Sequence, residues 1–176
     1  MGVDLLDEEL ASFDEPRRSA AGGLDQSRIR EPLRLLGPRK PLCLSPDATL
    51  ADAVRLMREH HVGCVLAVEH DRLVGILTER DLLLKLETID LSRTVRELMT
   101  PDPEVLQPDD PIVYALHRMA VGGYRHVPLV DDAGRPVGIL SVKELVHYVV
   151  SFFVSDVLTL PPDPARGQDW RARDGG

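Results

Sequence analysis

Two stretches of this chain carry apolar residues at the spacing of an amphipathic helix. The first is Leu50–Met57, and Thr49 just before it opens a capping-box pattern. The second is Ile112–Met119, with Asp110-Pro111 as the expected cap and first helical residue and Gly122-Gly123 as the expected stop. The pattern therefore predicts two helices of similar length.

Each predicted helix is followed by two short runs rich in β-branched residues, with a turn between them. The runs are Val62 to Val68 and Leu73 to Leu77 in one place, and Val127 to Val130 and Pro136 to Leu140 in the other. Each predicted hairpin leads directly into a further helix, capped by Thr78 or Ser141. The predicted unit is β-α-β-β-α, used twice, which is an α/β (α+β) fold.

The two units are copies of one repeat. Pro46-Asp47 returns as Pro108-Asp109, an offset of about 62 residues along the chain. One extra residue at the turn 131–134 raises the offset by one, so that Gly75-Ile76-Leu77 returns as Gly138-Ile139-Leu140. The repeat predicts a single compact domain built from two like halves.

The repeat also suggests where the chain divides. We expect a mobile acidic segment over 1–27, a first motif over 28–93, a second over 94–154 and a tail over 155–176. The second motif should open with a short capped helix at Thr94–Met99, which the prolines that follow bring to an end.

Composition narrows the function classes. The net charge of −8 argues against a broad nucleic-acid surface. Cys43 and Cys64 lie in apolar runs and form neither a disulfide framework nor a CxxC metal site. The N-terminus is acidic where a secretory signal is basic, and the longest apolar stretch is well short of the roughly 20 residues that span a membrane. A cytoplasmic protein without nucleic-acid or membrane partners is expected.

No arrangement of residues indicates catalysis or a metal. His60 and His61 are adjacent and do not share a helix face. Asp102, Asp109 and Asp110 lie where turns and caps favour aspartate. A nucleophile, base and orienting group do not occur at a meaningful spacing, and there is no glycine-rich phosphate loop. We therefore expect no enzyme, no metal site and no required cofactor.

Four segments together resemble a known family. They are Gly75–Asp81, Gly138–Ser141, Leu98–Pro101 and Arg125–Asp131, and their order and spacing are similar to those of a tandem cystathionine-β-synthase (CBS) domain pair, or Bateman module, over residues 28–154. The resemblance implies two pseudo-symmetric motifs packed side by side. It also implies a cleft for an adenosyl effector (AMP, ADP, ATP or S-adenosylmethionine), a homodimer, and an effector protein as partner.

The first copy matches the family's ribose and phosphate signature at Gly75, Thr78 and Asp81. A carboxylate can accept hydrogen bonds from both ribose hydroxyls, and Thr78 can face a phosphate. The alternative is that Thr78 and Asp81 form only a capping box. In the second copy Ser141 is kept but Glu144 replaces the aspartate, which favours the capping role and predicts a weak or empty second site.

The resemblance places further ligand contacts around Asp81. Arg125, His126 and Lys143 would meet the phosphates from the second motif, although solvated surface charges are the alternative. Gly63 would admit the adenine ring or merely end the preceding helix. The complete expected set is Val62, Gly63, Cys64, Thr78, Arg80, Asp81, Arg125, His126, Pro128 and Lys143, with Ser141 and Glu144 at the weaker site.

Two functions from different classes fit these features. One is a ligand sensor whose occupancy changes the packing of the motifs. The other is a structural dimerisation module without ligand. The apolar stretch from Val146 to Leu158 suggests burial against a second subunit, or packing against Ile29–Leu36 of the same chain.

Overall fold

The computed structural model describes residues 27–85 and 89–151. Apart from Ser27, the expected mobile segment lies outside this range, as do the expected tail and the apolar residues from Phe152 onward. Residues Asp25–Tyr148 form one compact unit, which holds the hairpins of both copies of the repeat. Within the described ranges, no helix combines the length and apolar character needed to cross a bilayer.

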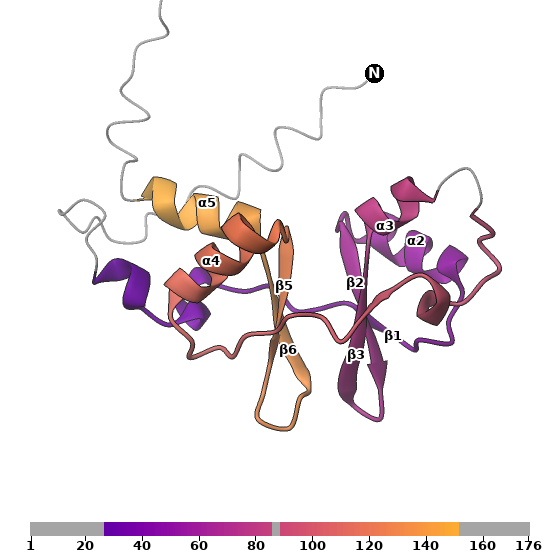
Figure 1. Cartoon of the computed structure of the whole chain (residues 1–176), viewed down its shortest axis with the longest axis horizontal. Coiled ribbons are helices and arrows are strands. Elements are labelled where there is room, and N and C mark those ends of the chain that lie inside the picture. Colours follow the sequence, from indigo (N-terminus) through magenta and orange to yellow (C-terminus); the bar gives the residue numbers. More distant parts are fainter. Residues whose placement is uncertain (1–26, 86–88, 152–176) are drawn as a thin grey trace, which may run out of the picture. The chain divides into compact units, whose positions relative to one another are not determined.

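The first copy folds as predicted. A four-stranded sheet has the order β1-β2-β3-β4, with β1 parallel to β2 and the other neighbours antiparallel. Figure 1 shows two helices beside the β2–β3 hairpin. The elements are β1 (Cys43–Leu44), α2 (Leu50–Glu59), β2 (Cys64–Glu69), β3 (Arg72–Thr78), α3 (Glu79–Leu84) and β4 (Thr100–Pro101).

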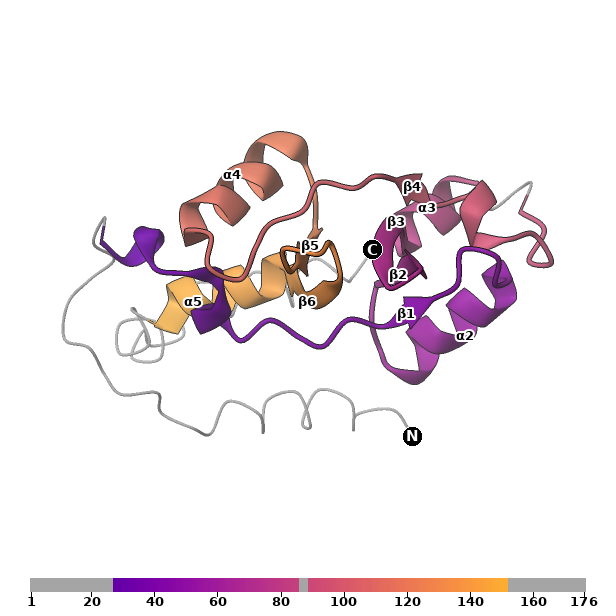
Figure 2. The ribbon, with the colours of Figure 1, turned by 90° about the horizontal axis from the view of Figure 1, so that it is seen from below.

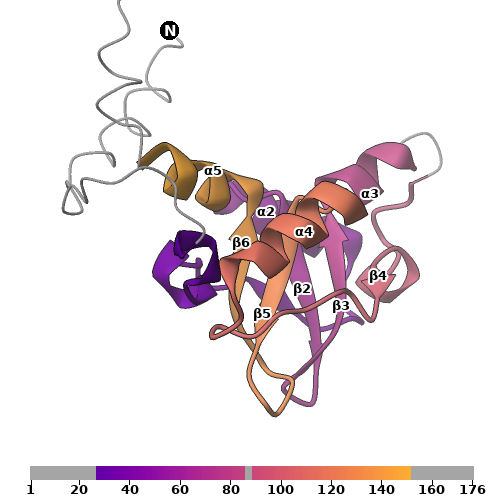
Figure 3. The same cartoon turned by 60° about the vertical axis from the view of Figure 1, so that its left-hand side comes forward.

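The second copy repeats this arrangement with a shorter sheet. Its elements are α4 (Ile112–Gly122), β5 (His126–Val130), β6 (Pro136–Ser141) and α5 (Val142–Ser151). Leu106 forms a parallel bridge with Leu129 where β1 stands in the first copy, 62 residues after the Leu44–Ala67 pair. Both hairpins are visible in Figure 3. The predicted β-α-β-β-α repeat is confirmed.

The cap of α2 agrees with the sequence prediction, whereas the cap of α4 differs from it. Thr49 caps α2 through the predicted capping box. The cap of α4 is Pro111 and not Asp110, so that prediction was wrong by one residue. The amide of Ile112 donates instead to the carbonyl oxygen of Glu31 (2.9 Å), and the Asp110 carboxylate accepts from the amide of Gln107. A distant backbone group thus replaces the side-chain cap.

Other local predictions hold in outline. Gly123 ends α4 in the left-handed conformation (φ 67°). The short helix expected at Thr94–Met99 is a single 3-10 turn, Val95–Glu97, with Thr94 and Glu97 as its capping box. Two more 3-10 turns, Arg28–Arg30 and Leu33–Leu36, precede the first copy.

Two connecting segments cross between the motifs. We call residues 31–39 the N-terminal strap and residues 93–101 the central strap. In the N-terminal strap, Leu33 and Arg34 donate backbone hydrogen bonds to the second-copy carbonyls of Asp110 and Pro108, both at 2.9 Å. The N-terminal strap leads into the first motif but packs on the second. The central strap leads into the second motif but packs on the first, as Figure 2 shows for β4 beside β3.

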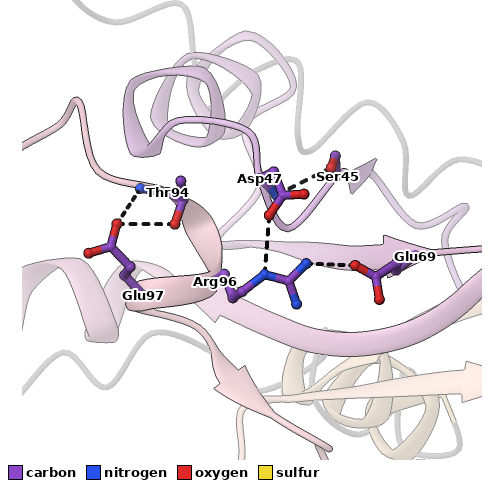
Figure 4. Close-up of polar contacts among 6 residues, drawn as sticks. All are labelled: Ser45, Asp47, Glu69, Thr94, Arg96 and Glu97. Atoms are coloured by element: carbon purple, nitrogen blue, oxygen red, sulfur yellow. Dashed lines mark hydrogen bonds and ion pairs between the residues drawn. The ribbon is translucent and has the colours of Figure 1, made fainter.

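The central strap makes the same bonds 62 residues later. Val95 and Arg96 donate to the carbonyls of Ala48 and Pro46, both at 2.8 Å. The guanidinium of Arg96 also bridges the carboxylates of Asp47 (3.1 Å) and Glu69 (2.6 Å), as Figure 4 shows. The backbone hydrogen bonds therefore recur at the same offset as the sequence repeat. Because each strap bonds to the other copy, their arrangement is that of a pseudo-twofold symmetry.

The straps complete both hydrophobic cores. Leu33 and Leu36 are buried in the core of the second motif, whereas Val95 and Leu98 are buried in the core of the first. Leu145 of α5 packs in the same cluster as Leu33, so α5 meets the N-terminal segment there. Each core depends on a segment that the chain places before the other motif.

A third cluster joins the two motifs. Cys64, Leu66 and Ile76 of the first motif are buried together, and Ile139 of the second packs against them. We call this contact the seam. It brings the beginning of β2, next to Asp81's helix, close to the second motif.

Candidate functional site

Asp81 lies in the first turn of α3, where Thr78 positions it. Its Oδ2 accepts hydrogen bonds from the Thr78 amide (2.8 Å) and the Thr78 hydroxyl (2.7 Å). The capping box is therefore present, as one of the two interpretations expected. Its other oxygen, Oδ1, accepts no hydrogen bond from any residue in the described part of the chain. Capping and ribose binding are compatible because they use different oxygens.

Glu144 holds the equivalent position at the start of α5 but has more partners. Its Oε2 accepts from the amide of Ser141 (2.7 Å) and from the Ser141 hydroxyl. Its Oε1 forms an ion pair with Nε of Arg39 at 2.9 Å, and only 11% of its side chain is exposed. Burial raises the pKa of Glu144, but the Ser141 hydrogen bonds and Arg39 outweigh it and hold that pKa below its usual value.

Sequence reasoning missed Arg39. Arg39 lies in the N-terminal strap and exchanges two backbone hydrogen bonds with Ile139 of β6, at 3.1 and 3.0 Å. Extending the repeat backwards from residue 46 would have paired the two straps and drawn attention to this residue. The ion pair itself has no sequence signal, because it depends on the crossing of the straps.

Glu79 is a second residue that the motif analysis did not single out. Its amide donates to the carbonyl of Gly63 at 2.9 Å, and its carboxylate lies about 3.3 Å from where a Cβ of residue 63 would stand. Gly63 does not end α2, because His60 is the C-cap, so that alternative was wrong. The missing side chain at Gly63 leaves room for the Glu79 carboxylate.

Cys64 and His126 occupy equivalent positions at the starts of β2 and β5. Cys64 pairs with Thr78 and His126 pairs with Ser141. Burial, followed by the charges of Glu79 and Glu144, raises the pKa of Cys64 to about 12. Both strands thus begin beside carboxylates from both motifs.

His126 has a similar environment, and burial favours its neutral form as well, although its pKa shifts in the other direction. Burial lowers the pKa of the imidazole, and Glu144 and Glu79 only partly oppose that effect. Arg125 lowers it further. Because Glu79 and Glu144 each act on residues of both motifs, these side chains gather around the seam.

The remaining predicted site residues divide into two groups. Arg80, Arg125 and Lys143 are exposed, as a phosphate contact requires. Val62 packs against the first core. Pro128 is fully buried within β5, so it serves packing and offers no surface to a ligand. In the described ranges, no three His, Cys, Asp or Glu side chains are close enough together to hold a metal ion.

Sequence comparison finds the CBS domain twice in this chain. The model of that family matches residues 36–88 and 95–151. An uncharacterised 17.7 kDa protein of Acidianus ambivalens is 33% identical over 109 residues, which cover 61% of this chain and 66% of that protein. The CBS domain-containing protein CBSCBSPB1 of Arabidopsis thaliana is 35% identical over 64% of this chain, but the match spans only 21% of the plant protein.

Solved structures share the fold. A CBS domain protein of Pyrobaculum aerophilum, PAE2072 complexed with AMP, has a TM-score of 0.63 and 25% identity, and the match covers 70% of this chain and 98% of that one. CBSX2 in complex with AMP has a TM-score of 0.57 and 25% identity, over 64% and 91% of the two chains. The family match covers more than half of the sequence and each copy has the same fold, so this chain belongs to the CBS domain family.

Proposed function

We propose that this chain is a regulatory CBS pair that binds an adenine nucleotide (AMP, ADP or ATP) or another adenosyl ligand in a cleft between the two motifs, beside the seam. The observation that carries the proposal is the carboxylate of Asp81, which uses Oδ2 for its helix and leaves Oδ1 without a hydrogen bond from the described residues. Two relatives at 25% identity are complexed with AMP. Both the chemistry and the family support an adenosyl ligand.

The proposed contacts come from both motifs. Oδ1 of Asp81 accepts hydrogen bonds from the ribose hydroxyls, while Oδ2 keeps its bonds to Thr78. Arg125 and Lys143 of the second motif meet the phosphate from their exposed positions. A ligand held in this way connects the two motifs directly.

Occupancy of this site acts as a signal and needs no catalysis. The N-terminal strap supplies part of the second motif's core, and the central strap supplies part of the first motif's core. A change in the packing at the seam therefore alters both motifs. A ligand that binds one packing more tightly shifts the population toward it. In this proposal a cytoplasmic homodimer or an effector protein detects the shift.

Isothermal titration calorimetry tests the proposal with AMP, ADP, ATP and S-adenosylmethionine as separate titrants. We expect binding heat and a rise in melting temperature with at least one of them, since a ligand of the folded state stabilises it by mass action. Mass spectrometry of small molecules retained on the purified protein gives an independent check. If no titrant gives heat or a thermal shift, the structural dimerisation module is the better description.

A matched variant separates the two roles of the carboxylate. Asp81→Asn keeps an oxygen for the Thr78 cap but places an NH2 group, which is a donor, where the ribose hydroxyls need an acceptor, so ligand binding should weaken. Asp52→Asn makes the same change in the equivalent capping box of α2, where Asp52 caps with Thr49. Equal loss of binding in both variants would show that binding is weakened by the disturbed helix caps and not by a lost ribose contact.

A further inference from the structure

We call Asp81 with Thr78 the first corner and Glu144 with Ser141 the second. The two corners differ in the partner of one carboxylate oxygen. At the first, Oδ1 of Asp81 accepts no hydrogen bond within the described part of the chain. At the second, the corresponding oxygen of Glu144 is paired with Arg39 at 2.9 Å. An arginine of the same chain thus occupies the place where the first corner would hold a ribose.

The backbone fixes Arg39 in this place. Two hydrogen bonds attach it to Ile139, just before the Ser141–Glu144 cap. In the first motif the residue in the same register is Thr100, which pairs with Ile76 in β4. Threonine carries no charge, so the first corner has no counterpart of the Arg39 ion pair at this position of its strap.

We propose that Arg39 is a specificity-determining residue that limits the pair to one nucleotide by acting as a built-in ligand of Glu144. The inference rests on the proposed function and deepens it. A ribose at the second corner must displace the guanidinium from a carboxylate that is only 11% exposed. Displacing the guanidinium leaves the Glu144 carboxylate without its cation in a partly buried place, which opposes binding there, whereas Arg39, with 53% of its side chain exposed, is solvated by water.

The cations expected to meet the phosphate also differ between the two corners. In the repeat, Gly63 is the equivalent of Arg125, and Arg80 is the equivalent of Lys143. Arg125 and Lys143 are the cations expected at the first corner, so Gly63 and Arg80 stand in their places at the second. Apart from Arg39 itself, the second corner therefore has one cation fewer for a phosphate. It also has the Glu79 carboxylate close to Gly63.

The test converts the second corner into the first and counts the ligands bound. Calorimetry with AMP, and separately with S-adenosylmethionine, is run on wild type and on the double variant Arg39→Thr/Glu144→Asp. We expect one ligand per chain for wild type and two for the double variant. Arg39→Lys, which keeps a cation, should stay at one. Arg34→Thr is the matched control in the same strap, because it removes only the exposed ion pair with Asp109.

The single variant Arg39→Thr keeps the Ser141–Glu144 cap and should show a second, weaker binding step. Circular dichroism and thermal unfolding check that each variant is folded. Two ligands on wild type, or a single binding step in both Arg39→Thr variants, would overturn this inference while leaving the proposed function intact. No binding of any titrant by wild type would overturn the proposed function and this inference together.

Discussion

The backbone amide of Leu33 donates a 2.9 Å hydrogen bond to the carbonyl oxygen of Asp110, although almost the whole first motif lies between the two residues in the sequence. Val95 and Ala48 form the equivalent bond at 2.8 Å. The two motifs are therefore joined by reciprocal straps as well as by the seam. Since each strap supplies buried residues to the opposite core, neither motif completes its core from its own contiguous sequence.

This crossing predicts that a substitution in the N-terminal strap destabilises the second motif. Leu33→Ala removes a fully buried side chain and should cost about 2–5 kcal/mol. Hydrogen exchange should increase more in β5 and β6 than in β2 and β3. Leu35→Ala is the control, because Leu35 is 47% exposed and its loss should change stability by about 0.5 kcal/mol or less. Faster exchange confined to β2 and β3 would contradict the crossing.

Asp81→Ala should weaken nucleotide binding strongly and leave the fold intact. Loss of the ribose contacts should cost about 2 kcal/mol, which is roughly a 30-fold increase in Kd. Loss of the cap should lower stability by about 1 kcal/mol. Titration calorimetry and urea unfolding measure the two effects separately. Glu144→Ala should change the affinity little, so a comparable loss in that variant would remove the assignment of unequal corners.

Stability should fall at acid pH because of Glu144. Its pKa is lowered in the folded state, so it binds a proton less readily there than in the unfolded chain. Its contribution is present above the usual carboxyl range, about pH 4–5, and disappears as the pH falls through its lower folded pKa. Urea unfolding should show a shallower acid limb for Glu144→Gln than for wild type. Glu59→Gln, at the exposed end of α2, is the control.

His126 should add a pH dependence in a higher range. Burial lowers its pKa, so the unfolded chain takes up a proton first as the pH falls through about 6.5. Stability should therefore decrease as the pH falls through the usual histidine range toward the lower folded pKa of His126, above the range in which Glu144 titrates. His126→Gln should flatten this part of the curve, as measured by thermal unfolding at a series of pH values. An unchanged slope would mean that the imidazole is as easily protonated in the fold as outside it.

Local sequence patterns were sufficient for most elements. The stripe from Leu50 to Met57 and the box of Thr49 with Asp52 involve only neighbouring residues, and α2 forms where they predict. The cap of α4 was misplaced because its first amide is satisfied by Glu31, far away in the sequence. Pro128 was expected near a ligand, yet its side chain is buried, because the whole run from Val127 to Val130 is buried and not only alternate residues, which the strand pattern alone did not show.

The sequence by itself determined the repeat, the helices and hairpins, and the family, because these depend on short-range spacing that recurs at an offset of about 62 residues. Only the tertiary structure decided that the straps cross, that Glu79 folds against Gly63 and that Arg39 reaches Glu144. Those contacts join residues far apart in the chain, and their geometry is set by how the two halves pack. A backbone register between distant segments leaves no periodic trace in the order of the amino acids.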